Sequence, residues 1–160
     1  MTSDMKLTWP ELLLGAMVGS MREVSAISNN RPDKGEMPRC PWEGHIEGAL
    51  AEMFVAKTLG VYWSGNLGDL QAADASVLQV RSTKYPTGRL MLHPEDKDDD
   101  WFVLVIGDKG AYRIAGCLKA KDGKRAEYWD ETLPAPCYAV PQAAMMAMPA
   151  SWWRATVMDF

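Results

Sequence analysis

The sequence predicts one α+β domain, in which helices flank a mixed, mostly antiparallel central sheet. Apolar residues recur at helical spacing up to about residue 60, and at alternate positions from residue 77 to residue 118. The chain has 160 residues, of which 48% are hydrophobic and 24% charged, so a core can form without disulfide or metal crosslinks. We divide the domain into an N-terminal helix (8–28), a helix and strand meander (42–118), and short helices with a C-terminal tail (119–160).

Residues 8–28 form the first predicted helix. Thr8 and Glu11 have the spacing of a capping box, and Pro10 is tolerated in the first turn because the N–H it lacks would have no partner there. Apolar side chains then recur near helical spacing at Leu13, Met17, Val24 and Ile27. The stretch 29–41 is rich in Asn, Pro and Gly and predicts a loop.

The second predicted helix spans residues 42–59, and Gly60 occupies its C-cap position. On a helical wheel Glu52 falls opposite Glu43, among apolar neighbours. A carboxylate in such surroundings requires a cation, a hydrogen bond or a raised pKa. His45 shares this face and is one candidate partner. Glu52 is therefore either a structural residue, which caps a loop or pairs with an arginine, or a functional acid.

The apolar period changes to two after the turn-rich stretch 62–74. Strands are predicted at residues 77–82, 89–93, 101–107 and 112–118. The remaining elements are a short polar helix or turn (119–129), an extended piece (138–140) and a helix (141–148). The tail is apolar for a chain terminus, so it either packs back on the domain or forms a homodimer surface.

The strand at residues 77–82 carries polar residues on one face. Leu78 and Val80 are expected to meet the core, which leaves Gln79 and Arg81 together on the opposite face. Asp74 lies just before this strand. A strand that turns its polar face to solvent would show the same alternation.

An acid on a helix, then an Asp, then an acid-x-Lys pair on a strand is the pattern of the PD-(D/E)xK nuclease superfamily, which this sequence resembles. Residues 48–60 (GALAEMFVAKTLG) resemble the first core helix, with Glu52 as its acid. The stretch D-x₄-Q-V-R resembles the motif strand, with Gln79 in place of the acid and Arg81 in place of the lysine. The chain also resembles small uncharacterised phage proteins of this type, which carry a VR-[ST]-T strand and a late VPQ segment (140–142 here).

The resemblance implies a restriction-endonuclease-like core and a divalent-metal-dependent DNA nuclease with a variant site. Asp74, Glu52 and Gln79 would hold Mg²⁺ or Mn²⁺, which activates water and neutralises phosphate charge. Arg81 would complete the catalytic set by binding phosphate, although a guanidinium does not act as a base near neutral pH. Lys84 and Arg89 flank the same strand face and are expected to bind the DNA backbone.

Two alternatives stand beside the nuclease. In one, the fold is retained without cleavage, and the protein binds nucleic acid or a host protein as an accessory factor or inhibitor. In the other, Glu52, Asp74 and Arg81 form a buried ion-pair network in a purely structural domain.

The charge and the cysteine content of the sequence bear on these three hypotheses. The net charge of −4 excludes a protein whose whole surface is basic, so any contact with nucleic acid is local. The acidic run 95–100 is expected to be a solvated hairpin tip, because it lacks the glycine and distal glutamate of a calcium loop. The three cysteines are expected to be free thiols, buried or without a function, in a reducing compartment.

The sequence also makes several classes improbable. It contains no phosphate-binding loop of the NTPase type and no nucleophile triad. It has no run of 18 apolar residues and no secretory signal, so we expect a cytoplasmic protein without membrane contact, in a phage-infected host cell if the resemblance holds.

Overall fold

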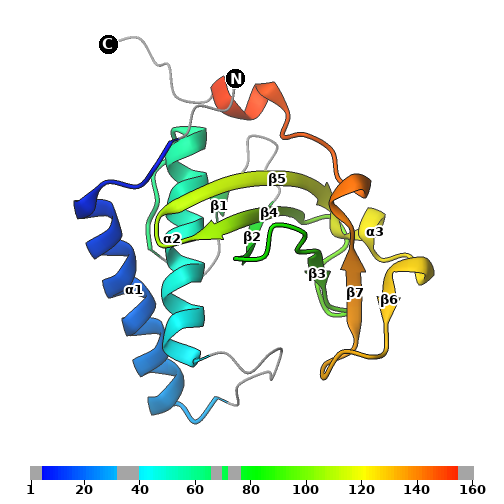
Figure 1. Cartoon of the computed structure of the whole chain (residues 1–160), viewed down its shortest axis with the longest axis horizontal. Coiled ribbons are helices and arrows are strands. Elements are labelled where there is room, and N and C mark those ends of the chain that lie inside the picture. Colours follow the sequence, from blue (N-terminus) through cyan, green and yellow to red (C-terminus); the bar gives the residue numbers. More distant parts are fainter. Residues whose placement is uncertain (1–4, 32–39, 66–69, 72–76, 155–160) are drawn as a thin grey trace.

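The computed structural model describes residues 5–31, 40–65, 70–71 and 77–154. Figure 1 shows three parts: two long helices on one flank, a strongly curved sheet across the middle, and a small second sheet on the other flank. This architecture confirms the predicted α+β class with a mixed sheet. Within the described ranges, no helix has both the length and the apolar character needed to cross a bilayer.

Helix α1 (Trp9–Ser28) begins at the predicted capping box, where the Thr8 N–H donates to the Glu11 carboxylate at 2.5 Å. On its inner face Gly15 and Gly19 are buried against α2. A Cβ at Gly19 would lie 2.4 Å from the Ile46 Cα atom, so only glycine allows this approach of the two backbones. The predicted apolar stripe consequently lies on the outer face of α1, where its side chains are about half exposed.

Helix α2 (Pro41–Leu59) is the core helix, and Gly60 ends it in the left-handed conformation at φ 67°. It packs against α1 on one side and against the central sheet on the other. Glu47 ties it to the strand layer, because its carboxylate accepts hydrogen bonds from the Tyr112 hydroxyl (2.5 Å) and the Lys109 N–H (3.2 Å). The helix is thereby held at the turn between two strands of the sheet.

The central sheet has the order β1-β2-β4-β5. Its strands are β1 (Leu70–Gln71), β2 (Val77–Thr83), β4 (Trp101–Asp108) and β5 (Ala111–Lys119). Strand β2 runs parallel to β4, whereas the β1–β2 and β4–β5 pairs are antiparallel. Leu78 is buried and Val80 packs on the same apolar cluster as α2, as predicted, so Gln79 and Arg81 lie on the other face of the sheet.

The second sheet corrects the prediction of one continuous meander. Strand β3 (Leu90–Leu92) leaves the central sheet and pairs with β7 (Cys137–Val140), which also pairs with β6 (Trp129–Asp130). Apolar side chains of β3 and β7 cover the second face of β4 and pack against Phe102 and Leu104. Because β4 is buried on both faces, its residues form a nearly continuous apolar run.

The chain after β5 forms short elements: α3 (Ala120–Gly123), η1 (Ala126–Tyr128), η2 (Gln142–Ala144) and η3 (Ala150–Arg154). The predicted helix at 141–148 is wrong beyond the single turn of η2, because Met146 instead exchanges backbone hydrogen bonds with Cys117 at 2.8 and 3.0 Å. Trp152 is buried and packs edge-on against Trp101, with ring centroids 5.0 Å apart. The described part of the tail therefore packs back on the domain.

Candidate functional site

A large cleft lies between the two helices and the second sheet. Its walls are the C-terminal half of α1 and the start of α2 on one side, and the residues leading into β7 on the other. The end of β2 and the turn that follows it complete the lining. The cleft holds about 1530 Å³, which exceeds the roughly 300–1,000 Å³ of a small-molecule pocket.

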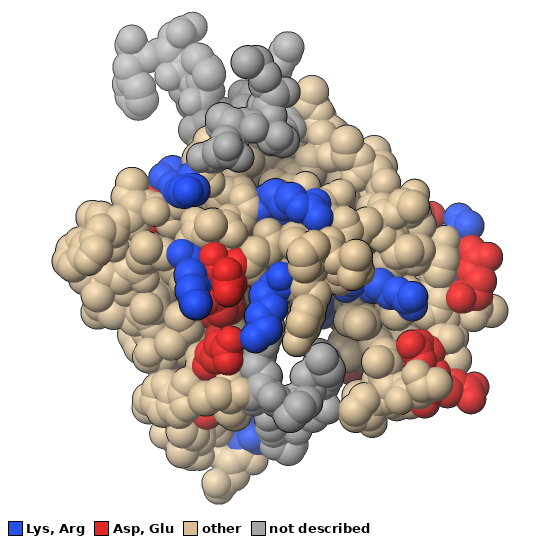
Figure 2. Space-filling model, in the orientation of Figure 1, with Lys and Arg blue, Asp and Glu red and all other residues tan. Residues whose placement is uncertain are grey.

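Basic side chains predominate in this cleft. Five of its described lining residues are basic: Arg22, Arg31, Arg81, Lys84 and Arg89. Two are acidic, Glu23 and Glu43. Figure 2 shows basic side chains above the hollow in the middle of this face and acidic side chains to its left. Glu52 neutralises Arg22, so the positive charge on the cleft wall comes from Arg31, Arg81, Lys84 and Arg89.

Arg81 projects from β2 into the cleft and is held in place by two neighbours. Its Nη2 atom donates to the Asp96 carboxylate at 3.3 Å, and its guanidinium lies over the Phe102 ring, 5.2 Å from the centroid. Asp96 is itself fixed by the His93 N–H at 2.8 Å. The Arg81 side chain is still 35% exposed and lines the cleft, so the N–H donors that Asp96 does not engage are available to a ligand there.

Lys84 and Arg89 extend the positive surface beyond Arg81. Lys84 begins the turn after β2, and its ammonium lies 3.8 Å from the Glu43 carboxylate of α2. Both partners are about half exposed, so this ion pair is weak and easily exchanged for another anion. Arg89 is exposed immediately before β3. Both residues line the cleft together with Arg81, as the predicted backbone-binding role requires.

Glu52 has a partner that the sequence did not identify. Its two carboxylate oxygens accept hydrogen bonds from Arg22 of α1 at 3.0 and 2.8 Å, and Trp63 Nε1 lies 3.4 Å away. The side chains of Arg22 and Glu52 are only 11% and 14% exposed. The candidate partner His45 instead lies 3.2 Å from the Glu23 carboxylate. Glu52 is thus paired with an arginine, which is the pairing that the structural alternative expected.

The predicted catalytic set is brought together only in part. Gln79 and Arg81 share one face of β2, where Gln79 stands beside Phe102 of β4. In the part of the chain that the structure describes, no hydrogen bond or ion pair joins Glu52 to either of them. Asp74 lies outside the described residues.

Of the predicted metal ligands that the structure describes, the carboxylate Glu52 is already engaged. A divalent cation requires carboxylate oxygens, and both oxygens of Glu52 are engaged by the Arg22 guanidinium. Among the described residues, no three His, Cys, Asp or Glu side chains are grouped so that they could hold a metal. The prediction of Mg²⁺ or Mn²⁺ therefore depends on Asp74.

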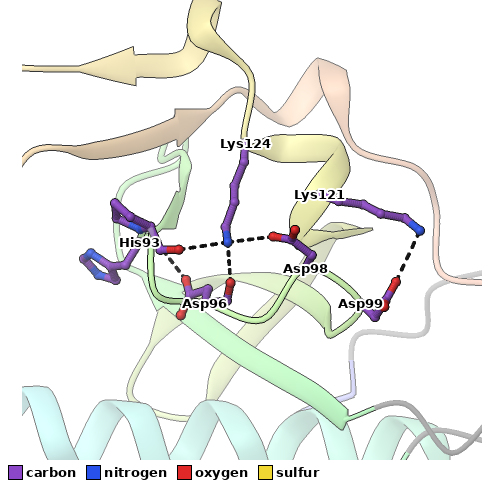
Figure 3. A network of polar contacts seen from close by, with 7 residues as sticks. His93, Asp96, Asp98, Asp99, Lys121 and Lys124 are labelled. Atoms are coloured by element: carbon purple, nitrogen blue, oxygen red, sulfur yellow. Dashed lines mark hydrogen bonds and ion pairs between the residues drawn. The ribbon is translucent and has the colours of Figure 1, made fainter.

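The acidic run 95–100 contacts a residue of the cleft, because its Asp96 pairs with Arg81. Figure 3 shows Lys124 inserted into this loop, where its ammonium donates to the carbonyl oxygens of Pro94 (3.0 Å) and Asp96 and to the Asp98 carboxylate (2.8 Å). Lys121 binds Asp99 at 3.2 Å. Asp98 and Asp99 are exposed as expected for a solvated tip, whereas the Asp96 side chain is only 13% exposed and holds Arg81.

Sequence reasoning missed Arg22 and Asp96. Arg22 lies 30 residues from Glu52 and belongs to no motif, so no local signal marks it. Asp96 is one of five acids in a short run, and only its place behind β2 distinguishes it from the others.

Comparison of the chain with family models, with curated proteins and with solved structures gave no match.

Proposed function

We propose that this protein binds the sugar–phosphate backbone of DNA in the cleft between α1, α2 and the second sheet. The supporting observation is that four basic side chains, besides the Arg22 that pairs with Glu52, line one cleft of an acidic protein: Arg31, Arg81, Lys84 and Arg89. The size of the cleft favours a polymer over a small anion. Phosphate contacts of this kind give affinity without reading base sequence.

Arg81 is the expected centre of this contact. An arginine can bind phosphate through two parallel hydrogen bonds, and its orientation by Asp96 and Phe102 lowers the entropy lost on binding. Lys84, three residues after Arg81, adds a second positive charge. Its ion pair with Glu43 is weak, so Lys84 can bind a phosphate instead. Because the rest of the molecule is acidic, attraction at long range is small and binding depends on these close contacts.

The test is binding of fluorescently labelled single-stranded and duplex DNA at low salt, followed by anisotropy. Arg81→Ala and Lys84→Ala should each weaken binding about tenfold, because each removes one charged contact. Lys121→Ala is the matched control, since Lys121 is paired with Asp99 and does not line the cleft. Absence of binding at low salt, or an equal loss in the control, would reject the proposal.

Cleavage of the bound DNA is the second candidate function. Its support is that α2, which carries Glu52, packs against β2, and that β2 begins three residues after Asp74. The side chains of Gln79 and Arg81 lie on the opposite face of β2 from α2. The test is incubation of linear and branched DNA with Mg²⁺ or Mn²⁺. Products that disappear in Asp74→Ala, while DNA binding persists, would support cleavage. Binding without products under both metals would exclude it and leave backbone binding as the function.

A further inference from the structure

The outer face of α1 carries a continuous apolar surface. Seven large side chains are each between 49% and 73% exposed: Trp9, Leu13, Leu14, Met17, Met21, Val24 and Ile27. At about 100° per residue they fall within an arc of about 140° on one side of the helix. The other residues in that arc are Pro10, Ser20 and Ser28, so it contains no charge. We call these seven side chains the α1 face.

Helix packing explains why this face points outward. An amphipathic helix normally turns its large apolar residues to the core. In α1 the inner positions hold Gly15 and Gly19, which bring its backbone against α2 too closely for larger residues. Figure 1 shows α1 at the edge of the molecule, with α2 between it and the sheets. The α1 face therefore has no partner among the described residues of its own chain.

We infer that the α1 face pairs with the same face of a second copy of this chain. Its seven side chains expose on the order of 800 Å², which matches the roughly 800 Å² that each partner buries in a standard interface. It exceeds the roughly 300–600 Å² of the largest apolar patch on a typical monomer. A single uncharged face of this size is suited to the self-complementary contact of a two-fold dimer.

The spacing of the side chains fits a helix pair. Leu14, Met17, Met21 and Val24 follow one another at intervals of three, four and three residues, which is the spacing of a coiled-coil seam. In an antiparallel pair the two helix dipoles oppose each other, and the middle of the α1 face, near Met17, lies at the two-fold axis. Trp9 of each copy would then lie toward the far end of its partner helix.

In this dimer the cleft of each copy would border the helix pair. Met21 and Ile27 belong to the α1 face and also line the cleft, so the interface and the cleft share the α1 wall. The inference itself rests on the α1 face and holds whether or not the cleft binds DNA.

Sedimentation velocity over 1–100 μM protein tests the pairing. Wild type should sediment as a dimer, and Met21→Lys as a monomer, because the substitution puts a charge in the seam. Met146→Lys is the matched control, since Met146 is also exposed but lies far from α1 in the sequence, beside β5. It should remain a dimer. Far-UV circular dichroism checks that both variants are folded.

Disulfide crosslinking tests the antiparallel order. In a Cys40→Ser background, which removes the exposed native thiol, Met17→Cys should form a crosslinked dimer on mild oxidation, and Trp9→Cys should not. A monomeric wild type at 100 μM, a dimeric Met21→Lys, or crosslinking through Trp9→Cys alone would overturn the inference. Binding of a monomeric wild type to lipid vesicles, lost in Met21→Lys, would overturn it in favour of a membrane surface.

Discussion

The Arg22–Glu52 pair holds two charges where little solvent reaches them. Both hydrogen bonds are short and parallel, which is the strongest arrangement available to an arginine and a carboxylate. Removing Arg22 leaves the Glu52 charge buried and almost without compensation, since among the described residues the Trp63 indole is the other hydrogen-bond donor to Glu52. The pair therefore links α1 to α2 and fixes the wall of the cleft.

Arg22→Ala should lower the free energy of unfolding by about 3 kcal/mol for this reason. Lys57→Ala is the control, because its pair with Glu11 is more exposed and should contribute about 1 kcal/mol or less. Urea denaturation followed by tryptophan fluorescence measures both. Equal losses in the two variants would mean that the Arg22–Glu52 pair is no stronger than a surface pair.

The cysteines give a second test at the scale of single residues. Burial raises the pKa of the Cys117 thiol to about 11, and Cys137 is also buried, whereas Cys40 is exposed. At pH 8 one thiol per native chain should react rapidly with a disulfide reagent such as DTNB, and all three after unfolding. Cys40→Ser should abolish the rapid phase. A rapid phase that persists in this variant would contradict the burial of the other two.

At the scale of elements, the contact of α1 with α2 depends on one glycine. Alanine is the better helix former by about 1 kcal/mol, yet a Cβ at Gly19 would lie 2.4 Å from the Ile46 Cα and 2.7 Å from the His45 carbonyl oxygen. Both obstacles are backbone atoms, so the helices must separate. The cost of separation should outweigh the gain in helix propensity.

Gly19→Ala should therefore destabilise the protein by about 1–3 kcal/mol. Gly48→Ala on α2 should stabilise it by up to about 1 kcal/mol, because nothing lies within 4 Å of the added Cβ. Thermal unfolding of the two variants compares the same chemical change on two adjacent helices. Shifts of the same sign would refute the close packing of α1 on α2.

Local signals predicted the elements well and their partners poorly. The capping box at Thr8 and the left-handed Gly60 mark helix ends because both act within a few residues of the chain. The pairing of β3 with β7 joins segments separated by the whole of β4 and β5, so no local pattern reports it. Periodicity likewise located the apolar stripe of α1 but could not show that two glycines turn it outward.

In the candidate site, too, local features were predicted from the sequence and tertiary contacts were not. The alternation in β2 placed Gln79 and Arg81 on one face, since the two-residue period of a strand is a local property. Helix geometry showed that Glu52 needs a partner, and the tertiary contact between α1 and α2 decided that Arg22 supplies it. The support of Arg81 by Asp96 depends on a loop that returns behind β2, which again is tertiary.

At the scale of the whole molecule, two clusters of charge stand apart. The loop 95–100 holds five of the 21 acidic residues, and Lys121 and Lys124 offset part of their charge, whereas five of the 17 basic residues line the cleft. The net charge of −4 opposes nonspecific adhesion to nucleic acid. Binding should therefore depend on the cleft and weaken steeply with salt, because each phosphate contact releases a condensed counterion.

The most direct test of the DNA-binding cleft is the salt dependence of the dissociation constant for duplex DNA. Three to four phosphate contacts predict that log K falls with log[salt] with a slope of about −2.7 to −3.6. The double variant Arg81→Ala/Lys84→Ala should reduce the magnitude of this slope by about two. A slope near zero in the wild type, or the same slope in the double variant, would contradict a cleft that binds the DNA backbone.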